Sequence, residues 1–146
     1  MPFEGFARRR RLRRAAQYRR VFAQPRKSSD RFFTLLARPQ DAHTDQATDT
    51  LAMRVPPPRV RLGLAISRKC AAKAVDRNRI KRLIRESFRR TTGFGCSVDI
   101  VVMCRPAASQ ADNQTLQRSL HRHWTKLREF ECVGSPNCSS ARTNCC

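Results

Sequence analysis

The sequence is short of acidic residues. Its 146 residues include 11 Asp and Glu against 31 Lys and Arg, which gives a formal net charge of +20. A protein nuclease that holds its own catalytic metal ions needs clustered carboxylates, but these Asp and Glu residues are scattered along the chain. His121 and His123 fall about 160° apart on a helical projection, so we predict that both are surface residues. We nominate no catalytic side chain, no metal ligand and no cofactor bound by the protein alone.

Long apolar runs are also missing. No segment approaches the ~18 apolar residues of a membrane helix, and no apolar stretch follows the N-terminal charges. We therefore expect a soluble cytoplasmic protein with no membrane partner. Cysteine is more frequent, but the count of seven is odd. Cys70, Cys96 and Cys104 lie in or beside periodic segments, where a thiol acts as a small core residue, and this pattern is typical of a reducing compartment.

The other four cysteines lie in a tail without periodicity, residues 131–146. They are Cys132, Cys138, Cys145 and Cys146. Their spacing lacks the C-x₂-C pairs of a structural zinc site, and the tail contains no His. We therefore predict a disordered tail in preference to a zinc site.

Positive charge is concentrated in two blocks. Residues 1–38 and 59–90 each carry 12 basic and 2 acidic side chains. Residues 39–58 lie between the blocks, contain three Asp and a run of three Pro, and are predicted to form a long loop. A large positive field concentrates polyanions, and its division into two blocks indicates two binding surfaces. Nucleic acid is the partner that this pattern favours.

The hydrophobic periodicity predicts a single α+β domain over residues 15–130, preceded by a basic arm at 1–14. Apolar residues recur at helical spacing in some segments and alternate or run continuously in others. The predicted order is helix, strand, strand, helix, strand, helix, at residues 15–23, 31–38, 60–69, 74–90, 97–105 and 112–130. Such an order favours an α/β sandwich in which helices cover a small sheet.

The predicted helix over residues 74–90, AVDRNRIKRLIRESFRR, carries seven Lys or Arg. At 100° per residue, one continuous face contains Ile80, Leu83, Ile84, Ser87 and Phe88. The opposite face contains Asn78, Arg82, Arg85 and Arg89, with Arg79 and Lys81 beside it. Only the Arg82–Glu86 pair would relieve the repulsion between like charges four residues apart. An uncompensated basic ridge favours contact with RNA or DNA over a solvated charged face.

Four aromatic residues lie in the first predicted helix and strand. Tyr18 and Phe22 share one helix face, whereas Phe32 and Phe33 point to opposite sides of the strand. These side chains either fill the core or line a groove between helix and sheet. In such a groove single-stranded bases stack on aromatic rings, which is worth about 1–3 kcal/mol per base. The surrounding arginines are compatible with the second alternative.

Residues 61–69, RLGLAISRK, followed by AVDRNRIKRLIRESFR, resemble the signature of the protein subunit of bacterial ribonuclease P. The segments RLRRAAQYRRVF, DIVVMCRPAA and DNQTLQRSLHRHW support the likeness, which covers residues 8–130. The resemblance implies a ribosomal-protein-like fold with a left-handed βαβ crossover. Spacing alone predicts the right-handed form, which occurs in about 98% of cases. The sequence departs from the family pattern in its long 39–58 loop and at Leu36, where the family often has an aromatic residue.

The resemblance further implies a subunit of an RNA-dependent endoribonuclease. The expected partners are a catalytic RNA, bound 1:1, and precursor tRNA. The RNA would carry the catalytic centre and its Mg²⁺ ions and remove the 5′ leader of the precursor. The residues that the resemblance assigns to catalytic-RNA binding are Arg68, Lys69, Arg77, Asn78, Arg79, Lys81, Arg82, Arg85 and Arg89. Those that it assigns to the leader cleft are Arg14, Tyr18, Phe22, Phe33 and Arg61.

Two other classes of nucleic-acid-binding protein share the charge. A ribosomal protein or RNA chaperone would bind many RNAs without stimulating one cleavage. A DNA-binding module would place the basic helix in a major groove, but the sequence shows neither a clear helix-turn-helix pair nor a dimer seam.

Overall fold

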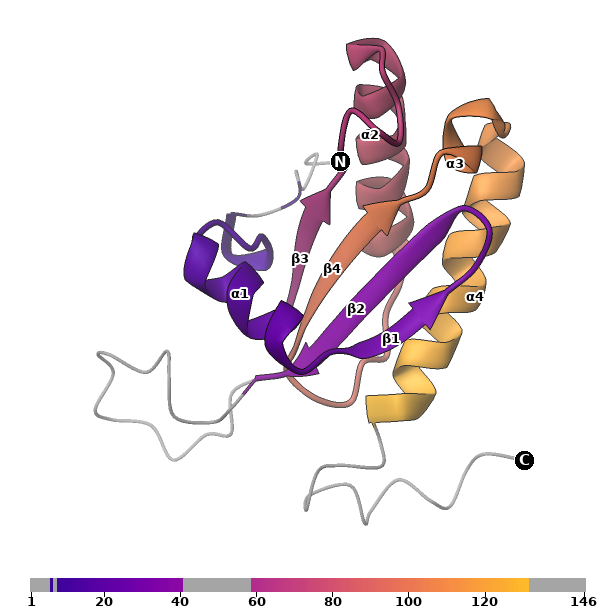
Figure 1. Cartoon of the computed structure of the whole chain (residues 1–146). Coiled ribbons are helices and arrows are strands. Elements are labelled where there is room, and N and C mark those ends of the chain that lie inside the picture. Colours follow the sequence, from indigo (N-terminus) through magenta and orange to yellow (C-terminus); the bar gives the residue numbers. More distant parts are fainter. Residues whose placement is uncertain (1–5, 7, 41–58, 132–146) are drawn as a thin grey trace, which may run out of the picture.

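Four strands form one mixed sheet between two layers of helix (Figure 1). The computed structural model describes residues 6, 8–40 and 59–131. Most of the predicted loop and tail, including the four tail cysteines, lies outside the described residues. In chain order the elements are η1 (Arg8–Arg10), α1 (Ala15–Ala23), β1 (Arg26–Ser29), β2 (Phe33–Pro39), β3 (Val60–Ala65), α2 (Ala74–Arg90), β4 (Val98–Cys104), α3 (Ala107–Gln110) and α4 (Asn113–Glu131).

The strand order is β1-β2-β4-β3. β1 with β2 and β2 with β4 are antiparallel, whereas β3 and β4 are parallel and are connected through α2. In Figure 1, β3 and β4 point the same way, β4 lies to the right of β3, and α2 lies behind the sheet. This connection is left-handed. The right-handed form that spacing alone predicts is therefore wrong, and the rarer form implied by the resemblance is confirmed.

β1 is a strand that the sequence pattern does not reveal. Its residues are RKSS, and only Ser28 is buried, so it lacks the apolar alternation that identifies strands. Pairing with β2 defines it, from Arg26 opposite Ala37 to Ser29 opposite Thr34. The sheet therefore has four strands where the pattern predicts three.

Helix α2 has the predicted bounds and buries the predicted face. Ile80, Ile84 and Phe88 are fully buried. Ser87 accepts a hydrogen bond from the indole Nε1 of Trp124 at 2.8 Å, which joins α2 to α4. On α4, the predicted apolar series is buried as well, at Leu116, Leu120, Trp124 and Leu127. Both helices thus pack on the same side of the sheet.

The sheet has an apolar cluster on each face. The larger lies between the sheet and helices α2 and α4 and includes Ile100 and Val102 of β4. The smaller lies under α1 and contains Leu12, Val21, Leu36 and Val101. Neighbouring residues of β4 point to opposite faces, so this strand contributes to both clusters. Its burial confirms that it is covered on both sides.

The basic arm continues the sheet beyond the free edge of β3. Leu12 N–H donates to the carbonyl of Leu62 at 3.0 Å, and Arg11 forms an isolated parallel bridge with Leu62. The N–H of Leu64 donates to the Tyr18 hydroxyl at 3.3 Å. Leu12 of the predicted basic arm and Tyr18 of the predicted aromatic groove therefore form hydrogen bonds with the backbone of β3, an edge strand.

Cys70 and Cys104 are joined in a disulfide, with their Cα atoms 5.9 Å apart. Both residues belong to the core as predicted, since Cys70 is buried in the larger cluster and Cys104 packs against it, but here they are joined to one another. Cys104 is the last residue of β4 and Cys70 lies just after β3. Because β3 and β4 run parallel, residues near their carboxyl ends come close although 34 positions separate them in sequence.

Gly63 of β3 allows α1 to pack closely on the sheet. A Cβ atom at this position would lie 2.8 Å from Cε1 of Tyr18 and 2.9 Å from Cδ1 of Leu12. We expect Gly63→Ala to lower the free energy of unfolding by about 1–3 kcal/mol, because the tyrosine ring has to move. Urea denaturation measures the change.

Gly95 provides the matched control. A Cβ there would meet no heavy atom within 4 Å, so Gly95→Ala should change stability by no more than about 0.5 kcal/mol. Equal unfolding midpoints for the two variants would show that the packing at Gly63 is not restrictive.

Candidate nucleic-acid interface

The outward side of α2 carries basic side chains directly opposite its buried face. We call Asn78, Lys81, Arg82 and Arg85 the α2 ridge. Asn78 and Arg82 are exposed, and Lys81 and Arg85 are half-buried. Lys81, Arg82 and Arg85 form no hydrogen bond or ion pair with any other described residue. Their charges are therefore not neutralised within this part of the chain and are available to an external anion.

Arg68 and Lys69 lie in the turn between β3 and α2, and both are exposed. The turn is closed by the N–H of Cys70, which donates to the carbonyl of Ser67 at 3.2 Å. Neither basic side chain has a partner among the described residues. They add positive charge to the end of the molecule at which α2 begins.

Arg77 acts within the protein. Its Nη1 donates to the carbonyl oxygens of Ala71 at 2.9 Å and Ala72 at 2.7 Å. These carbonyls belong to the segment between the Arg68–Lys69 turn and α2. Arg77 therefore holds in place the segment that follows Arg68 and Lys69.

Arg79 connects α2 to the segment between α3 and α4. Its guanidinium donates to the carbonyls of Ser109 at 3.1 Å and Ala111 at 3.2 Å, and to Oδ1 of Asn113 at 3.0 Å. The helical projection places Arg79 beside the basic face, but its guanidinium is bonded within the protein. Replacing Arg79 should therefore destabilise the fold, because hydrogen bonds to charged groups contribute about 1.5–3 kcal/mol each.

Arg89 is paired with Glu86 and not with an external group. Its Nη2 lies 2.7 Å from Oε1 of Glu86, and Nε of Arg90 lies 3.0 Å from the same oxygen. The hydrogen bond from Arg89 and the charges of both arginines lower the pKa of the Glu86 carboxyl. The expected Arg82–Glu86 pair is therefore wrong, which leaves Arg82 uncompensated.

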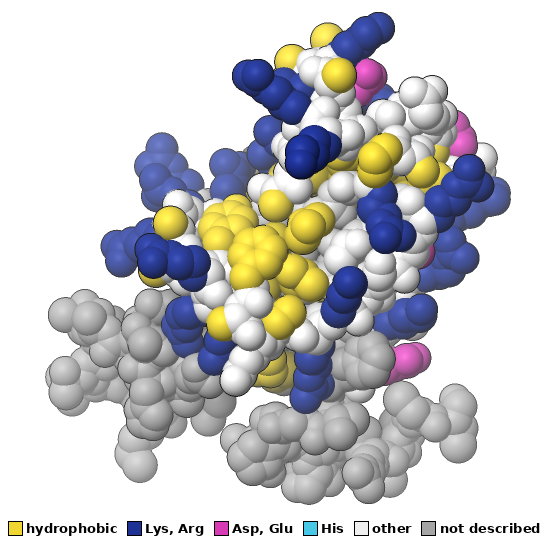
Figure 2. All heavy atoms as spheres, in the orientation of Figure 1, with side chains coloured by type: hydrophobic (Ala, Val, Ile, Leu, Met, Phe, Trp, Pro, Cys, Tyr) yellow, Lys and Arg dark blue, Asp and Glu magenta, His cyan; other side chains and the backbone are white. Residues whose placement is uncertain are grey.

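A second surface lies on the other side of the sheet, beside α1. Hydrophobic side chains gather there on the open face, and Lys and Arg surround them (Figure 2). Tyr18 and Met103 are partly buried against the small apolar cluster, and Phe22 remains 45% exposed. Arg14, the N-cap of α1, is exposed as well. We call this surface the α1 groove, after the groove between helix and sheet that is one of the two sequence-based alternatives for its aromatic residues.

Phe33 does not lie in the α1 groove. It is fully buried in the larger cluster, on the face covered by α2 and α4. The strand alternation in β2 places Leu36 on the α1 face instead, where it belongs to the small cluster. The assignment of Phe33 to the leader cleft, which the resemblance implied, is therefore wrong. Strand periodicity could not have tested it, because it separates the two faces of a strand without showing which one α1 covers. Phe32 also packs against the larger cluster.

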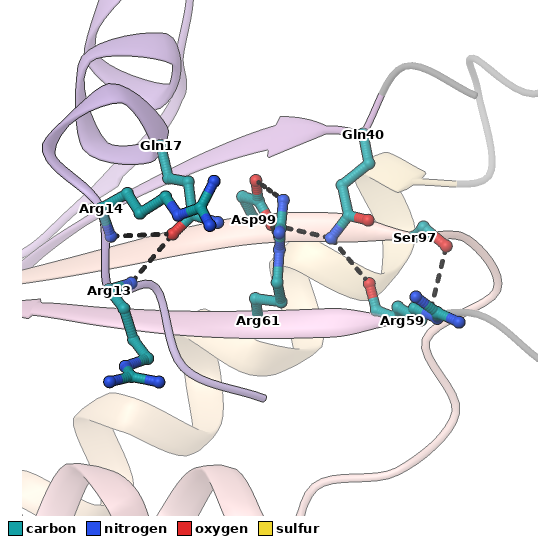
Figure 3. A network of polar contacts seen from close by, with 8 residues as sticks. All are labelled: Arg13, Arg14, Gln17, Gln40, Arg59, Arg61, Ser97 and Asp99. Atoms are coloured by element: carbon teal, nitrogen blue, oxygen red, sulfur yellow. Dashed lines mark hydrogen bonds and ion pairs between the residues drawn. The ribbon is translucent and has the colours of Figure 1, made fainter. Parts of the chain in front are cut away.

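Arg61 lies on the face of α1 but is paired internally (Figure 3). Its Nε and Nη2 donate to the two carboxylate oxygens of Asp99 at 2.7 and 2.8 Å. Gln40 donates a further hydrogen bond to Oδ1 of Asp99 at 2.7 Å. The side chains of Arg61 and Asp99 are 12% and 9% exposed. Arg61 therefore joins β3 to β4, and its charge is largely balanced before any ligand binds.

His123 is buried, so the prediction that it is a surface residue is wrong, whereas His121 is exposed as predicted. Nδ1 of His123 lies 2.7 Å from the Ser28 hydroxyl. Its Nε2 lies 3.2 Å from Oδ2 of Asp30, outside hydrogen-bonding geometry. Asp30 also accepts a hydrogen bond from Ser119 of α4. This polar cluster connects the β1–β2 hairpin to α4. Because Ser28 is buried, its hydroxyl is not accessible to a substrate.

Within the described ranges, no group of three or more His, Cys, Asp or Glu could hold a metal ion. The same ranges contain no helix that is both long and apolar enough to cross a membrane.

The sequence and the fold match a known family. The family model described as ribonuclease P matches residues 6–128. The chain belongs to the ribonuclease P protein family. It is 48% identical over 124 residues to the ribonuclease P protein component of Thioalkalivibrio sulfidiphilus, with 85% of this chain and 91% of that protein covered.

Solved ribonuclease P proteins have the same fold. The Staphylococcus aureus protein superimposes with a TM-score of 0.62 at 27% identity, covering 81% of this chain and 94% of that one. The Thermotoga maritima protein gives a TM-score of 0.60 at 28% identity, covering 80% and 96%. The chain is therefore a subunit of ribonuclease P, a tRNA-processing endoribonuclease, and membership of this family implies association with ribonuclease P RNA.

The buried histidine generates a prediction for stability against pH. Removal from water lowers the pKa of His123 below its ordinary 6.5, Asp30 opposes this shift, and the charges of Lys126 and Arg122 reinforce it. The unfolded chain therefore takes up a proton near pH 6.5 before the folded chain does. The free energy of unfolding should fall as the pH drops from 7.5 to 5.5, by at most about 1.4 kcal/mol per pH unit for one proton.

Replacing the histidine isolates its contribution. His123→Gln should be less stable at pH 7.5 but should lose less stability on acidification, as measured by urea denaturation at each pH. His121→Gln, on the exposed side of the same helix, should keep the wild-type pH dependence. Identical pH profiles for wild type and His123→Gln would contradict the prediction. Asp30 does not interfere in this range, because hydrogen bonds hold its pKa below 3.8 despite its burial.

Proposed function

We propose that the protein docks on the catalytic RNA of ribonuclease P through the α2 ridge and holds the 5′ leader of precursor tRNA in the α1 groove. By doing so it assists the Mg²⁺-dependent removal of the leader. The observation that carries this proposal is the set of unpaired cations on α2, Lys81, Arg82 and Arg85. They lie on a helix whose other side is fixed in the core, so an RNA backbone would meet them in a rigid arrangement.

The electrostatic role follows from the charges. Precursor tRNA and the catalytic RNA are both polyanions and repel one another. A protein of formal charge +20 with cations on both faces of its sheet reduces this repulsion when it lies between them. Each phosphate contact releases condensed counterions, so the affinity should fall steeply with salt.

The α1 groove suits a single strand more than a duplex. Exposed Phe22 beside partly buried Tyr18 offers aromatic surface on which unpaired bases can stack without sequence preference. Arg14 and the other basic side chains around the groove would contact the backbone (Figure 2). Leu36 lies beneath this surface and provides apolar contact but no ring for stacking.

We assign the chemistry to the RNA, as the family resemblance implies. The Mg²⁺ ions would be bound with the RNA subunit, and the protein would bind it 1:1 in the cytoplasm. The protein's own residues would position the two RNAs. No step of the cleavage is assigned to a side chain of this chain.

The α2 ridge is tested by single replacements. Arg82→Gln and Arg85→Gln should each weaken binding to a bacterial ribonuclease P RNA about fivefold to tenfold and reduce the slope of log affinity against log salt by about 1. Filter binding over a series of salt concentrations measures both quantities. The same proteins, mixed with this RNA and labelled precursor tRNA at low Mg²⁺, should release less 5′ leader.

Lys126→Gln is the matched control, because Lys126 is an exposed cation on α4 away from the ridge. It removes one positive charge and should leave affinity nearly unchanged. Equal losses for all three variants would indicate a general charge effect and would contradict docking through α2. Binding to unrelated RNAs with no stimulated cleavage would favour an RNA chaperone instead.

The α1 groove is tested by Phe22→Ala. This variant should weaken the binding of precursor tRNA to the reconstituted enzyme by about 1–3 kcal/mol, the value of one base stacked on an aromatic ring. The affinity for mature tRNA, which has no leader, serves as the internal control and should not change. A parallel loss for both RNAs would place Phe22 outside the leader site. Because Phe22 is 45% exposed, its replacement should lower thermal stability only slightly.

A further inference from the structure

Helix α2 forms one wall of a groove, and α4 forms the other. A hollow of about 890 Å³ lies between the end of α2 and the middle of α4, where it is lined by Arg90, Arg118 and Arg122 among others. A second hollow, of about 610 Å³, lies between the first half of α2 and the start of α4 and includes Asn78 and Arg82 of the ridge. Glu86 and Gln117 line both hollows, so the two adjoin. We call them together the α2–α4 groove.

The charge of the α2–α4 groove is strongly positive. Glu86 is the only carboxylate among its lining residues, and it is already paired with Arg89 and Arg90. Arg118 and Arg122 are exposed on α4 and form no hydrogen bond or ion pair with another described residue. They stand four residues apart, a spacing at which like charges on a helix repel. As on the α2 ridge, this repulsion is relieved by an anion from outside.

The polar lining indicates the kind of anion. Gln114, Gln117 and His121 contribute amide and imidazole groups, which can bond to sugar hydroxyls and base edges as well as to phosphate. Large exposed apolar side chains are few in the groove, because Leu83 and Trp124 are almost fully buried and Val75 is the exposed one in its lining. A single exposed valine offers an amphipathic helix fewer anchors than the i, i+3, i+4 and i+7 set that such a helix uses.

The dimensions favour a single strand. Packed helices lie about 8–10 Å apart between axes, so the trough between α2 and α4 is narrower than an RNA duplex. Each hollow falls in the range of about 300–1,000 Å³ that is typical of ligand pockets, which gives room for a few nucleotides. Unpaired nucleotides also present the base edges that the glutamines can reach.

We propose that the α2–α4 groove binds an unpaired segment of the RNA that docks on the α2 ridge, with Arg118 and Arg122 contacting its phosphates. This inference rests on the proposed docking of RNA on α2. The RNA-binding surface then includes two helices. Basic side chains of α2 attract the RNA backbone, and side chains of α4 contact the same strand. The amide groups of Gln114 and Gln117 would hydrogen-bond to base edges and so distinguish one nucleotide from another, which arginines bound to phosphates do not.

The test compares Arg118→Gln and Arg122→Gln, singly and together, with Lys126→Gln. Lys126 lies on the same helix outside the groove and carries the same charge. With a bacterial ribonuclease P RNA transcript as probe, the double variant should bind about tenfold more weakly. Its salt slope should fall by about 0.7 for each lost single-strand contact. Both arginines are exposed, so thermal melting should show unchanged folds.

The outcomes separate this inference from the proposed function. If the α4 variants behave like Lys126→Gln while Arg82→Gln and Arg85→Gln lose affinity, docking on α2 stands and the α2–α4 groove is not an RNA site. If none of the variants loses affinity, both proposals fail. If only the α4 variants lose affinity, RNA binds α4 without docking on α2, and both the α2 ridge and the two-walled α2–α4 groove are overturned.

Photocrosslinking identifies the occupant directly. A benzophenone side chain in place of Gln117 should crosslink to the RNA in the reconstituted enzyme, and the crosslinked nucleotides should map to an unpaired segment. The same group in place of Lys126 should crosslink to RNA much less. Crosslinks confined to protein, or mapped only to duplex RNA, would overturn the inference.

Discussion

The burial of β4 on both faces of the sheet is the constraint on which the rest of the structure depends. Ile100 and Val102 fix α2 and α4 to one face, and Val101 contributes to the cluster under α1 on the other. With a formal charge of +20, the chain repels itself when compact, and apolar burial has to overcome that repulsion. Once β4 is covered on both sides, the α2 ridge and the α1 groove necessarily face in opposite directions.

The arginines of this protein divide into two groups that look alike in sequence. Arg61, Arg77 and Arg79 donate to carboxylate or carbonyl groups of other segments, whereas Arg82 and Arg85 have no such partner among the described residues. Within the first group, Arg77 and Arg79 bind α2 to neighbouring segments and so fix the position of Arg82 and Arg85. Binding energy on α2 therefore depends on arginines that need not touch the RNA, and a loss of binding after their replacement would reflect lost positioning as well as lost charge.

Much of the fold could be predicted from periodicity. The bounds of α2 and the apolar faces of α2 and α4 agree with the sequence pattern, because long amphipathic helices carry a strong signal. β1 was not predicted, because a strand whose only buried side chain is Ser28 shows no apolar alternation. The left-handed crossover followed from the family resemblance and not from any local pattern.

The candidate site was less predictable, and the reason is that its residues take their roles from distant partners. The residues near Arg79 in the sequence do not indicate that it binds the carbonyls of Ser109 and Ala111, and those near His123 do not indicate its contact with Ser28. Phe33 illustrates the other difficulty, because alternation along β2 could not tell which face α1 would cover. By contrast, Phe22 and Arg82 lie on the helix faces on which the helical projections place them.

The pairing of the basic arm with β3 also bears on how the free protein avoids aggregation. An open sheet normally leaves two edges whose unpaired backbone groups can recruit another chain. Here Leu12 and Tyr18 occupy backbone groups along β3, and the opposite edge strand, β1, exposes Arg26 and Lys27. One edge is covered and the other is charged, so copies of this subunit that have not yet met RNA are protected from edge-to-edge association with one another.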